Sequence, residues 1–381
     1  MPLEDPKAHH RAWAGALVLL SAALFALVAA NSPLGPAYQR LWDTSYRLPF
    51  GIVASLHGVV DKGLMTAFFL VVGLDLKREA RHGALRHPRA MALPLIAALA
   101  GMIAPALIYH ALNAGPSTAN GWAIPMSTDV AFAAGVLALL GRRAPRNLLI
   151  FLLALAIVDD IAAVLVIALY YTRHWRPWAL VAVFAVATVL FVPSWRRARG
   201  LPSYLGLGAI LWWALGRAGI DPPLAGVVLA AAIPSSAPGA SDGASARLER
   251  RLAPYVTFGV LPLFALANSA LVLARADFTA RTSVFLGVFL GLLLGKFAGV
   301  GGASWLALRT RLAHPPTGVT FRHILGAAWL SGIGFTMALF INTLAFTPGP
   351  ARDAAKLGVL LASSTAAVLG GLWLAREARK P

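Results

Sequence analysis

The sequence has no cysteine and few charged residues. Without cysteine, the chain can form no disulfide, no thiolate metal site and no thiol nucleophile. Charged residues make up only 13% of it and hydrophobic residues 59%, whereas soluble domains are about a quarter charged and about half apolar. With a mean hydropathy of +0.72, the composition predicts a protein that crosses a membrane many times.

Acidic residues are scarce, with 15 aspartates and glutamates against 33 lysines and arginines and a formal net charge of +18. Such a charge can indicate a nucleic-acid-binding protein. Here, however, the basic residues lie in short connections between apolar runs and form no stripe interleaved with aromatic residues. Most of them fall in alternate connections, the asymmetry typical of cytoplasmic loops. We therefore expect both termini in the cytoplasm and no nucleic-acid partner.

Apolar runs divide the chain into about twelve segments that are interpreted as membrane helices. They lie at approximately 12–30, 52–75, 91–112, 122–140, 148–171, 178–194, 203–216, 223–235, 256–274, 283–308, 324–346 and 357–375. The first ends without the small-residue cleavage site of a signal peptide, so it is expected to remain as a membrane helix. No polar connection is long enough for a soluble domain, which leaves one membrane domain over residues 1–381.

Two adjacent aspartates, Asp159 and Asp160, lie near the middle of the fifth, otherwise uncharged segment. That segment can cross the roughly 30 Å hydrocarbon core of a bilayer as a helix. A charge at the centre of a membrane helix costs at least about 2.5–3.5 kcal/mol on insertion scales. The two carboxylates therefore require cations, protons or a basic partner, and this requirement indicates a functional site.

Lys296, the only lysine or arginine at the centre of a segment, is the natural partner of one aspartate. Consecutive helical residues point about 100° apart, so one aspartate can pair with Lys296 while the other faces a cavity. A buried structural ion pair is the alternative interpretation. It leaves the second aspartate and Asp129 of the fourth segment unexplained, and three acids against one base would attract a hard cation or protons.

Oxygen ligands dominate this set of residues, because Ser127 and Thr128 precede Asp129. Carboxylates, hydroxyls and carbonyls suit Na⁺, Li⁺, Ca²⁺ or Mg²⁺, and no cluster of Cys or His argues for a transition metal. Neighbouring carboxylates have coupled proton affinities, so protons and a metal ion would compete for the same oxygens. That competition is sufficient for exchange transport.

The fourth and eleventh segments contain helix interruptions. Pro125 precedes Asp129 in the fourth, and Gly332 and Gly334 lie in the middle of the eleventh. Glycine costs about 1 kcal/mol relative to alanine inside a helix, although small residues also allow close packing of membrane helices. The two interruptions together favour an ion site between broken helices. There Asp129 could neutralise the positive helix ends and Lys296 the negative ones.

Seven short motifs follow one another in a fixed order over nearly the whole chain. They are VGLDLKRE at 72–79, WAIP at 122–125, STDVAFA at 127–133, AIVDD at 156–160, LPLFA at 261–265, GK at 295–296 and GIGFTM at 332–337. Each is weak alone, but in this order the chain resembles the NhaA-type sodium/proton antiporter family. Members of that family are built from inverted-topology repeats with ion sites near the membrane midplane.

The resemblance implies an all-α polytopic membrane protein with about 12 transmembrane helices and inverted-topology repeats over about 91–171 and 283–375. The fourth and eleventh helices would be broken. It implies a secondary transporter of a bacterial cytoplasmic membrane that exchanges cytoplasmic Na⁺ or Li⁺ for external protons. Two protons per cation would make the exchange electrogenic. Such a protein is not an enzyme and needs no cofactor, since the transported ions are its substrates.

The resemblance also assigns roles by position. Asp160 would be a principal carrier of the cation and protons, and Asp159 its essential neighbour, salt-bridged to Lys296 in the proton-loaded state. Together the two aspartates would bind the transported Na⁺. Asp129 and Thr128 would assist them at the crossing of the two broken helices.

The pH-response region of the family, a cytoplasmic funnel, corresponds here to Asp75, Arg78, Glu79 and Glu249. Asp75 stands where a glutamate is usual, and Glu249 is followed by Arg250 and Arg251 rather than by histidines, which leaves the alkaline set-point open. The outer loop after the first helix usually forms a dimer-making β-hairpin. Here that loop is short and contains Pro49, so a homodimer also stays open.

The remaining charged residues are expected to matter less. Asp221 and Arg217 flank an outer turn and are interpreted as solvated loop charges. Asp61 and Lys62 of the second segment, with His57, could line a funnel or form a local interfacial pair.

Other functions were weighed against exchange transport. An intramembrane aspartyl protease needs two carboxylates that converge to share a proton, whereas Asp159 and Asp160 are adjacent and diverge. A retinal-binding pump could use Lys296 as a Schiff base, but about twelve segments argue against it. A transporter of K⁺ or Ca²⁺, or a channel, is the closer alternative. Proton counterflow separates an exchanger from a channel.

Overall fold

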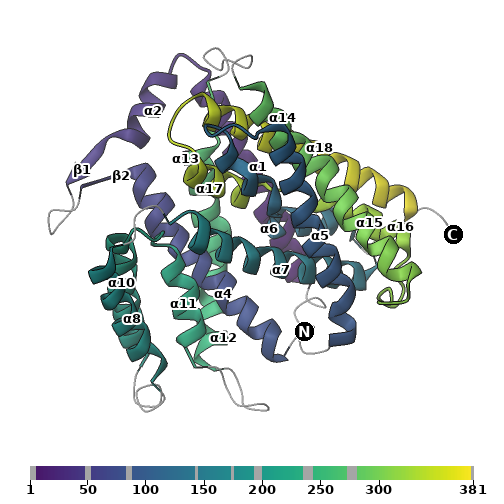
Figure 1. Ribbon diagram of the computed structural model, residues 1–381, viewed down its shortest axis with the longest axis horizontal. Helices are drawn as coiled ribbons and strands as arrows, with labels where there is room; N and C mark the ends of the chain where they lie inside the picture. The colour runs from purple at the N-terminus through teal and green to yellow at the C-terminus, as the bar shows by residue number, and fades with distance from the viewer. Residues whose placement is uncertain are drawn as a thin grey trace. The chain divides into compact units, whose positions relative to one another are not determined.

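The computed structural model describes residues 6–47, 53–82, 88–141, 145–172, 176–192, 200–234, 243–272 and 281–378. In these ranges the chain is almost entirely helical, and its strands form one short antiparallel hairpin (Figure 1). Contacts divide the chain into two compact units, which are described separately. The first comprises Met1–Gly35, Ala84–Ala163 and Asn268–Pro381, and the second comprises Pro36–Gly83 and Val164–Ala267.

Most elements of the two units fall within the apolar runs of the sequence. The first unit holds α1 (Pro6–Ala30), α5 (Pro88–Leu112), the 3₁₀-helix η4 (Ala119–Met126), α6 (Val130–Leu139), most of α7 (Arg146–Tyr170), α14 (Thr282–Leu290), the π-helical turn η8 (Gly291–Gly295), α15 (Lys296–Arg309), α16 (Phe321–Leu330), α17 (Phe335–Ala345) and α18 (Pro350–Glu377). The second holds most of α2 (Gly35–Asp43), β1 (Ser45–Arg47), β2 (Val53–Ser55), α3 (Leu56–Gly58), the π-helical η2 (Val59–Leu64), α4 (Met65–His82), α8 (Pro177–Phe191), α10 (Leu201–Ala218), α11 (Leu224–Ala232), α12 (Ala244–Tyr255), the π-helical η6 (Val256–Val260) and most of α13 (Leu261–Asn268).

Several helices are long and apolar enough to cross a membrane. Within the described ranges there are six such stretches, and α16 with α17 make a seventh if the bent pair counts as one span. Many large apolar side chains on these helices are exposed, for example Leu24 at 59% and Leu107 at 63%. Apolar side chains on both the buried and the exposed faces are typical of helices surrounded by lipid. The chain is therefore a helical membrane protein of several spans.

Two interruptions of the helical backbone meet in the first unit. α16 and α17 are bent by 44° at the break 331–334, and extended residues from Ser127 to Asp129 separate η4 from α6. The backbone N–H of Asp129 donates to the carbonyl of Ile333 at 2.6 Å. This hydrogen bond joins the two interruptions directly, so the backbone freed by each one finds a partner in the other.

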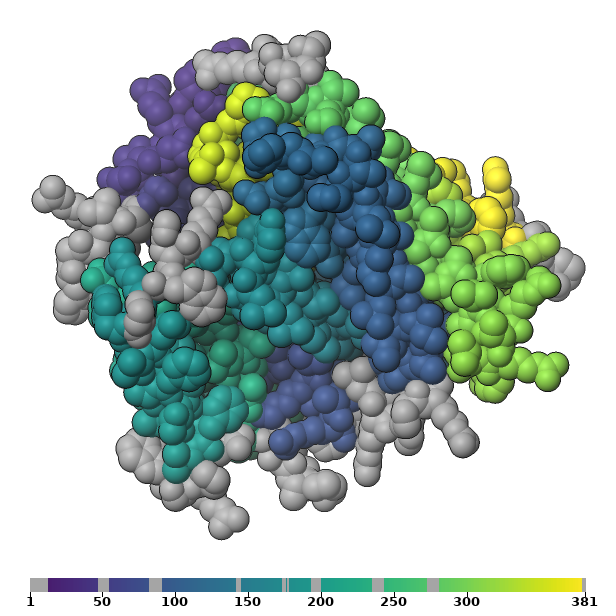
Figure 2. All heavy atoms as spheres, in the orientation of Figure 1, coloured from purple at the N-terminus to yellow at the C-terminus, as the bar shows by residue number. Residues whose placement is uncertain are grey.

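Close packing of α15 along α5 fixes the position of Lys296. Figure 2 shows the two surfaces side by side, α5 in blue and α15 in green. A Cβ on Gly295 would lie 2.8 Å from the Cα of Pro105, and one on Gly299 would lie 2.8 Å from the carbonyl carbon of Ala100. Any larger residue at either glycine would push the helices apart. Because Lys296 follows Gly295 directly, its backbone is held by this contact.

In the second unit, α4 packs against α11 and binds its C-terminal end. The Lys77 ammonium donates to the carbonyls of Ala230 at 3.1 Å, Ala231 at 2.7 Å and Ile233 at 2.5 Å. These carbonyls have no partner within the helix, and their partial negative charge favours a cation. Lys77, which belongs to the motif at 72–79, therefore caps the C-terminal end of α11 in this unit.

The connection that follows α1 contains a short β-hairpin, an element that is usual at this place in the family that the sequence resembles. β1 and β2 pair antiparallel with Tyr46 opposite Ala54. Pro49 lies outside the described residues. The question of a homodimer stays open, because a hairpin on one chain does not show a partner.

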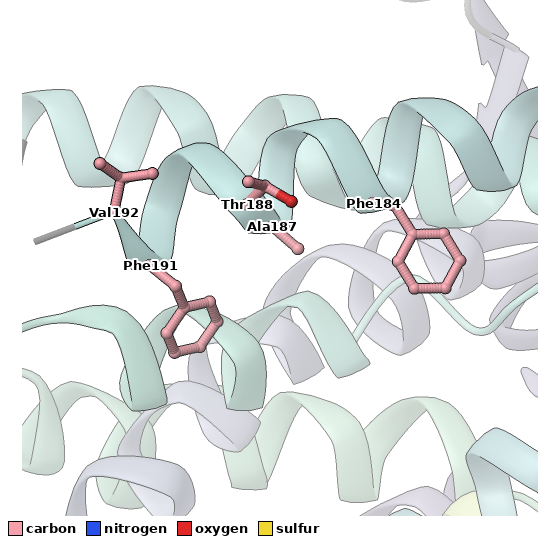
Figure 3. Close-up of a pocket in the computed structure, with 5 residues that line it drawn as sticks. All are labelled: Phe184, Ala187, Thr188, Phe191 and Val192. Atoms are coloured by element: carbon pink, nitrogen blue, oxygen red, sulfur yellow. The ribbon is translucent and has the colours of Figure 1, made fainter.

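An apolar groove runs along the exposed face of α8 and is unsuitable for an ion. Figure 3 shows its lining, which consists of Phe184, Ala187, Thr188, Phe191 and Val192. None of these side chains is charged, and the hydroxyl of Thr188 is the single polar group among them. With Phe184 exposed at 69%, the groove has the composition of a surface that contacts lipid tails.

Candidate functional site

Asp159 and Lys296 form a fully buried ion pair in the first unit. The Lys296 Nζ lies 2.5 Å from Asp159 Oδ2, and neither side chain is exposed. The hydroxyl of Thr128 lies 2.7 Å from the same carboxylate oxygen. Asp159 Oδ1 is buried without a hydrogen-bond partner, so the carboxylate keeps coordinating capacity. Of the two adjacent aspartates, Asp159 is the one that the structure places against Lys296.

Asp160 has different surroundings from its neighbour. It is 8% exposed, and its side chain diverges from that of Asp159 by about 100° around α7. Asp160 interacts electrostatically with Lys296, whereas the hydrogen bond of Lys296 goes to Asp159. The site therefore contains two carboxylates under the influence of one ammonium group, and its charge depends on what else is bound.

Asp129 occupies the N-terminal ends of two helices at once. Its Oδ1 accepts the N–H of Phe132 at 2.9 Å, which caps α6. Its Oδ2 accepts the N–H of Thr336 at 3.0 Å and the hydroxyl of Thr336 at 2.5 Å, at the start of α17. A carboxylate is stabilised at the positive end of a helix. Three donors thus satisfy an acid for which the sequence offered no basic partner.

Thr128 connects the ion pair with the break between α16 and α17. Its Oγ1 lies 2.7 Å from Asp159 Oδ2 and 2.8 Å from the carbonyl oxygen of Ser331. One hydroxyl proton serves one acceptor at full strength. When Asp159 carries a proton, it can donate to Thr128, whose own proton then goes to Ser331. The arrangement can therefore transmit the protonation of Asp159 to the end of α16.

The two glycines of the eleventh segment lie in the break and provide space there. A Cβ on Gly332 would lie 2.7 Å from the carbonyl oxygen of Leu292 and 3.2 Å from the Cβ of Ala366. A Cβ on Gly334 would lie 2.8 Å from the Leu292 side chain. Residues of η8 and α18 thus approach the break closely. A larger residue at either glycine would push them away.

The π-helical turn η8 precedes Lys296 and packs against η4. A Cβ on Gly291 would lie 2.8 Å from the Cβ of Pro125, so the proline that interrupts the fourth segment contacts this turn. π-helical turns are rare in proteins, and those that occur often lie at functional sites. The extra residue in such a turn changes the direction in which the following side chains point. The turn therefore helps to set the direction of Lys296 towards Asp159.

Sequence reasoning missed Ser363, a buried residue of α18. Its Oγ accepts the N–H groups of Gly334 and Phe335, both at 3.2 Å. Its neighbour Ser364 is exposed and donates to the carbonyl of Leu360 on its own helix. Small polar residues are common in membrane helices, so no pattern in the sequence separates Ser363 from Ser364.

The four residues assigned to pH response lie together in the second unit. Arg78 of α4 forms ion pairs with Asp75, with Glu79 at 3.5 Å and with Glu249 of α12. Burial raises the pKa of Glu249 above its ordinary value, Arg78 opposes that rise, and the charges of Asp75 and Glu79 add to it. Glu249 is therefore a carboxyl whose charge changes at a higher pH than usual.

Asp221 corrects an expectation from the sequence. It was interpreted as a solvated loop charge, but in the turn between α10 and α11 it is half-buried and its Oδ2 has no hydrogen-bond partner. Burial raises the pKa of Asp221 to about 7, with Lys62 lowering it and Asp61 raising it. The expectation failed because the fold buries this carboxyl in the turn, an effect larger than those of the two charged residues of η2.

The other charged residues singled out in the sequence are Arg217 and the residues around Asp61. Arg217 is exposed, with its guanidinium 5.6 Å from the ring centroid of Trp178 and 5.8 Å from that of Trp213. His57 Nε2 lies 3.1 Å from Asp61 Oδ2, four residues on. This geometry favours the local interfacial pair over a funnel lining.

Asp221→Asn is expected to raise the melting temperature more at about pH 8 than at about pH 5, because the raised pKa makes ionisation of Asp221 unfavourable in the folded state. The destabilisation is absent below the unfolded pKa of about 4, grows between about 4 and 7, and is complete above that. Thermal unfolding of the purified protein at both pH values measures the effect. The exposed Asp43 of α2 provides a control, Asp43→Asn, and an equal shift at both pH values would contradict the prediction.

No resident metal centre is found in the part of the chain that the structure describes. There, no group of three or more His, Cys, Asp or Glu residues is arranged to hold a metal ion. The buried oxygen set around Asp159, Asp160 and Thr128 is smaller than the six to eight ligands of a typical Ca²⁺ site.

Several known proteins are similar to this chain over nearly its whole length. A model of the family described as Na⁺/H⁺ antiporter 1 matches residues 7–374. A protein of Vibrio parahaemolyticus named Na(+)/H(+) antiporter NhaA is 46% identical over 94% of this chain and 93% of its own length. Proteins of the same name from Acidithiobacillus ferrooxidans and Rhodospirillum rubrum are 44% and 45% identical, each over 97% of this chain and 96% of its own length. With matches over nearly its whole length, the chain belongs to the Na⁺/H⁺ antiporter 1 family.

Proposed function

We propose that the protein exchanges cytoplasmic Na⁺ or Li⁺ for external protons across a bacterial cytoplasmic membrane. The names of its relatives support Na⁺/H⁺ exchange. One observation supports the proposal at the level of individual residues. Lys296, Asp159 and Thr128 form a buried group beside two helix interruptions. Charged groups inside a membrane protein are energetically costly. Binding of a transported cation would account for their presence here.

Competition for the same carboxylate oxygens would drive the exchange. In the proton-loaded state, Lys296 is the positive partner of Asp159. A cation that binds Asp159 and Asp160 would replace that ammonium group, and returning protons would displace the cation again. Uptake of two protons, one by Asp160 and one by Lys296 as it pairs with Asp159 again, would accompany release of one monovalent cation, so each cycle would move net charge. The transport would therefore be electrogenic.

The fold suggests how the site would reach both sides of the membrane. We infer two inverted repeats, over about 91–171 and 283–375, in a chain of about twelve membrane helices with both termini in the cytoplasm. Each repeat would contain one broken helix, η4–α6 in the first and α16–α17 in the second. Movement of this pair against the remaining helices would expose Asp159 and Asp160 alternately to each side. No catalytic reaction and no resident cofactor is needed.

Proton movement in everted membrane vesicles tests the proposal. Vesicles that contain the protein are acidified by respiration, and the internal pH is followed with a fluorescent dye after addition of NaCl, LiCl, KCl or choline chloride. Alkalinisation with Na⁺ or Li⁺, absent from vesicles without the protein, would support the exchange. A response to K⁺ alone would reassign the cation. No response to any of these salts across the tested pH range would overturn the proposal.

Glu249→Gln is expected to displace the pH–activity profile towards alkaline pH while the maximal rate stays within about twofold. Glutamine is neutral at every pH and so resembles the protonated glutamate. With the pKa of Glu249 raised by burial, the wild type gains its negative charge only as pH rises, and the charge then pairs with Arg78. A variant that cannot gain it should keep low-pH behaviour at higher pH. Rates of exchange measured across pH provide the profile.

A second glutamate in an ion pair provides the control for this substitution. Glu377 lies 3.7 Å from Arg322, and Glu377→Gln should leave the profile where it is. If Glu249→Gln also leaves it unchanged, Glu249 takes no part in the pH response.

A further inference from the structure

The start of α17 carries backbone N–H groups that the helix itself cannot satisfy. The first four N–H groups of any α-helix lack an intrahelical acceptor, and a buried one without a partner costs about as much as a lost hydrogen bond. At this end, Gly334 and Phe335 donate to Ser363, while Thr336 donates to Asp129. Two side chains, one neutral and one acidic, thus share the positive end of one half-helix.

α18 brings Ser363 to the break through a face of small residues. Ala366, one turn further on, would touch a Cβ on Gly332 at 3.2 Å, and a Cβ on Gly370 would lie 2.6 Å from the side chain of Leu330 at the end of α16. Ser363 itself is only 3% exposed. Its hydroxyl is therefore shielded from solvent and serves as the acceptor for the two N–H groups at this end of the helix.

The other acceptor at this end of the helix belongs to the ion site. Asp129 follows Thr128 directly, and Thr128 hydrogen-bonds Asp159. If the Ser363 hydroxyl were removed, two N–H groups would lose their acceptor next to the Asp129 carboxylate. They would then compete with Thr336 for its oxygens and draw Asp129, with Thr128, away from Asp159.

We propose that Ser363 is a positioning residue for cation binding: by capping Gly334 and Phe335 it leaves the Asp129 carboxylate to Thr336 and so holds Thr128 against Asp159. This inference deepens the proposed exchange and rests on it. Ser363 does not touch the transported ion. Its influence passes through the break between α16 and α17, so it should change cation affinity more than maximal rate.

Ser363→Ala is expected to raise the apparent KM for Na⁺ about fivefold, which corresponds to about 1 kcal/mol, and to leave the maximal exchange rate within about twofold. Ser363→Thr keeps the hydroxyl and should return the KM to near the wild-type value. Cysteine has nearly the volume of serine, but its sulfur is a weak hydrogen-bond acceptor. The KM of Ser363→Cys should therefore resemble that of Ser363→Ala, which distinguishes a lost hydrogen bond from lost packing. Ser364→Ala, on the exposed face of the same helix, is the matched control.

The vesicle assay separates failure of this inference from failure of the exchange itself. If the wild type exchanges Na⁺ and Ser363→Ala has the KM of Ser364→Ala, the role of Ser363 is overturned and the exchange stands. If the maximal rate of Ser363→Ala falls with the amount of folded protein while its KM stays at the wild-type value, and Ser363→Cys is normal, the serine serves packing only and the inference is overturned. A wild type without Na⁺-driven proton movement would overturn both.

Hydrogen exchange supplies a readout that does not depend on transport. Deuterium uptake by the peptide that contains Gly334 and Phe335, followed by mass spectrometry in detergent, should be faster in Ser363→Ala and Ser363→Cys than in wild type or Ser363→Thr. Equal uptake in all four proteins would overturn the capping role. Protection restored by threonine together with a restored KM would support the inference.

Discussion

Asp160→Asn should reduce Na⁺-driven proton movement to the level of vesicles without the protein. Asparagine has nearly the shape of aspartate but cannot take up and release a proton, and its neutral amide is a poor partner for a cation. Since Asp160 is 8% exposed and lies beside the Lys296–Asp159 pair, the substitution removes one of the two carboxylates on which the exchange depends. The vesicle assay with Na⁺ and Li⁺ measures the loss.

The fold should survive this change, which makes the result interpretable. Replacing a buried carboxylate by an isosteric amide removes a desolvation cost rather than a packed group. The melting temperature of Asp160→Asn should therefore equal or exceed that of the wild type. Asp353→Asn, in the first turn of α18, is the same substitution outside the site and should exchange normally. Wild-type exchange by Asp160→Asn would show that the carriers lie elsewhere.

Lys296→Ala is expected to lose both transport and about 3–5 kcal/mol of stability, because removal of one partner leaves the other charge buried without compensation. Asp159 would keep the Thr128 hydroxyl but lose the ammonium 2.5 Å away. Thermal unfolding at neutral pH measures the first effect, and the vesicle assay measures the second. The loss of stability should shrink at low pH, where Asp159 can take up a proton.

Two further variants separate charge from packing at Lys296. Lys356, also buried, donates to the carbonyl of Ala270 at 2.7 Å, so Lys356→Met tests the loss of a buried lysine outside the site. Lys296→Met combined with Asp159→Asn removes both charges and should recover most of the stability without restoring exchange. An unchanged melting temperature of Lys296→Ala would contradict the ion pair.

The membrane character and the charged residues of the site could be predicted from the sequence. Whether a segment partitions into a bilayer depends on its length and residue types, so the apolar run around Asp159 and Asp160 needed no structure to identify it. Lys296 was found in the same way, because a charge within an apolar segment is costly wherever its partners lie. Gly332 and Gly334 indicated a break because glycine weakens any helix.

The partners of these residues could not be predicted to the same extent. Asp159 and Asp160 are equally close to Lys296 along the chain, and the structure places Asp159 against it through the packing of α15 on α5 and the turn η8. Asp129 had no expected basic partner, since its donors include the backbone N–H groups of Phe132 and Thr336. The sequence indicated positive helix ends as partners of Asp129, but it did not indicate which N–H groups would reach the carboxylate.

The sequence by itself determined that carboxylates and an ammonium group lie within a membrane-spanning chain, because the cost of burying a charge belongs to the residue type. Tertiary structure alone decided which hydrogen bonds satisfy them. A hydrogen bond needs its two atoms within about 3 Å, and the packing of distant helices brings them there. Ser363 and Gly334 are 29 residues apart, and Thr128 and Ser331 are 203 apart. No local pattern can specify either contact.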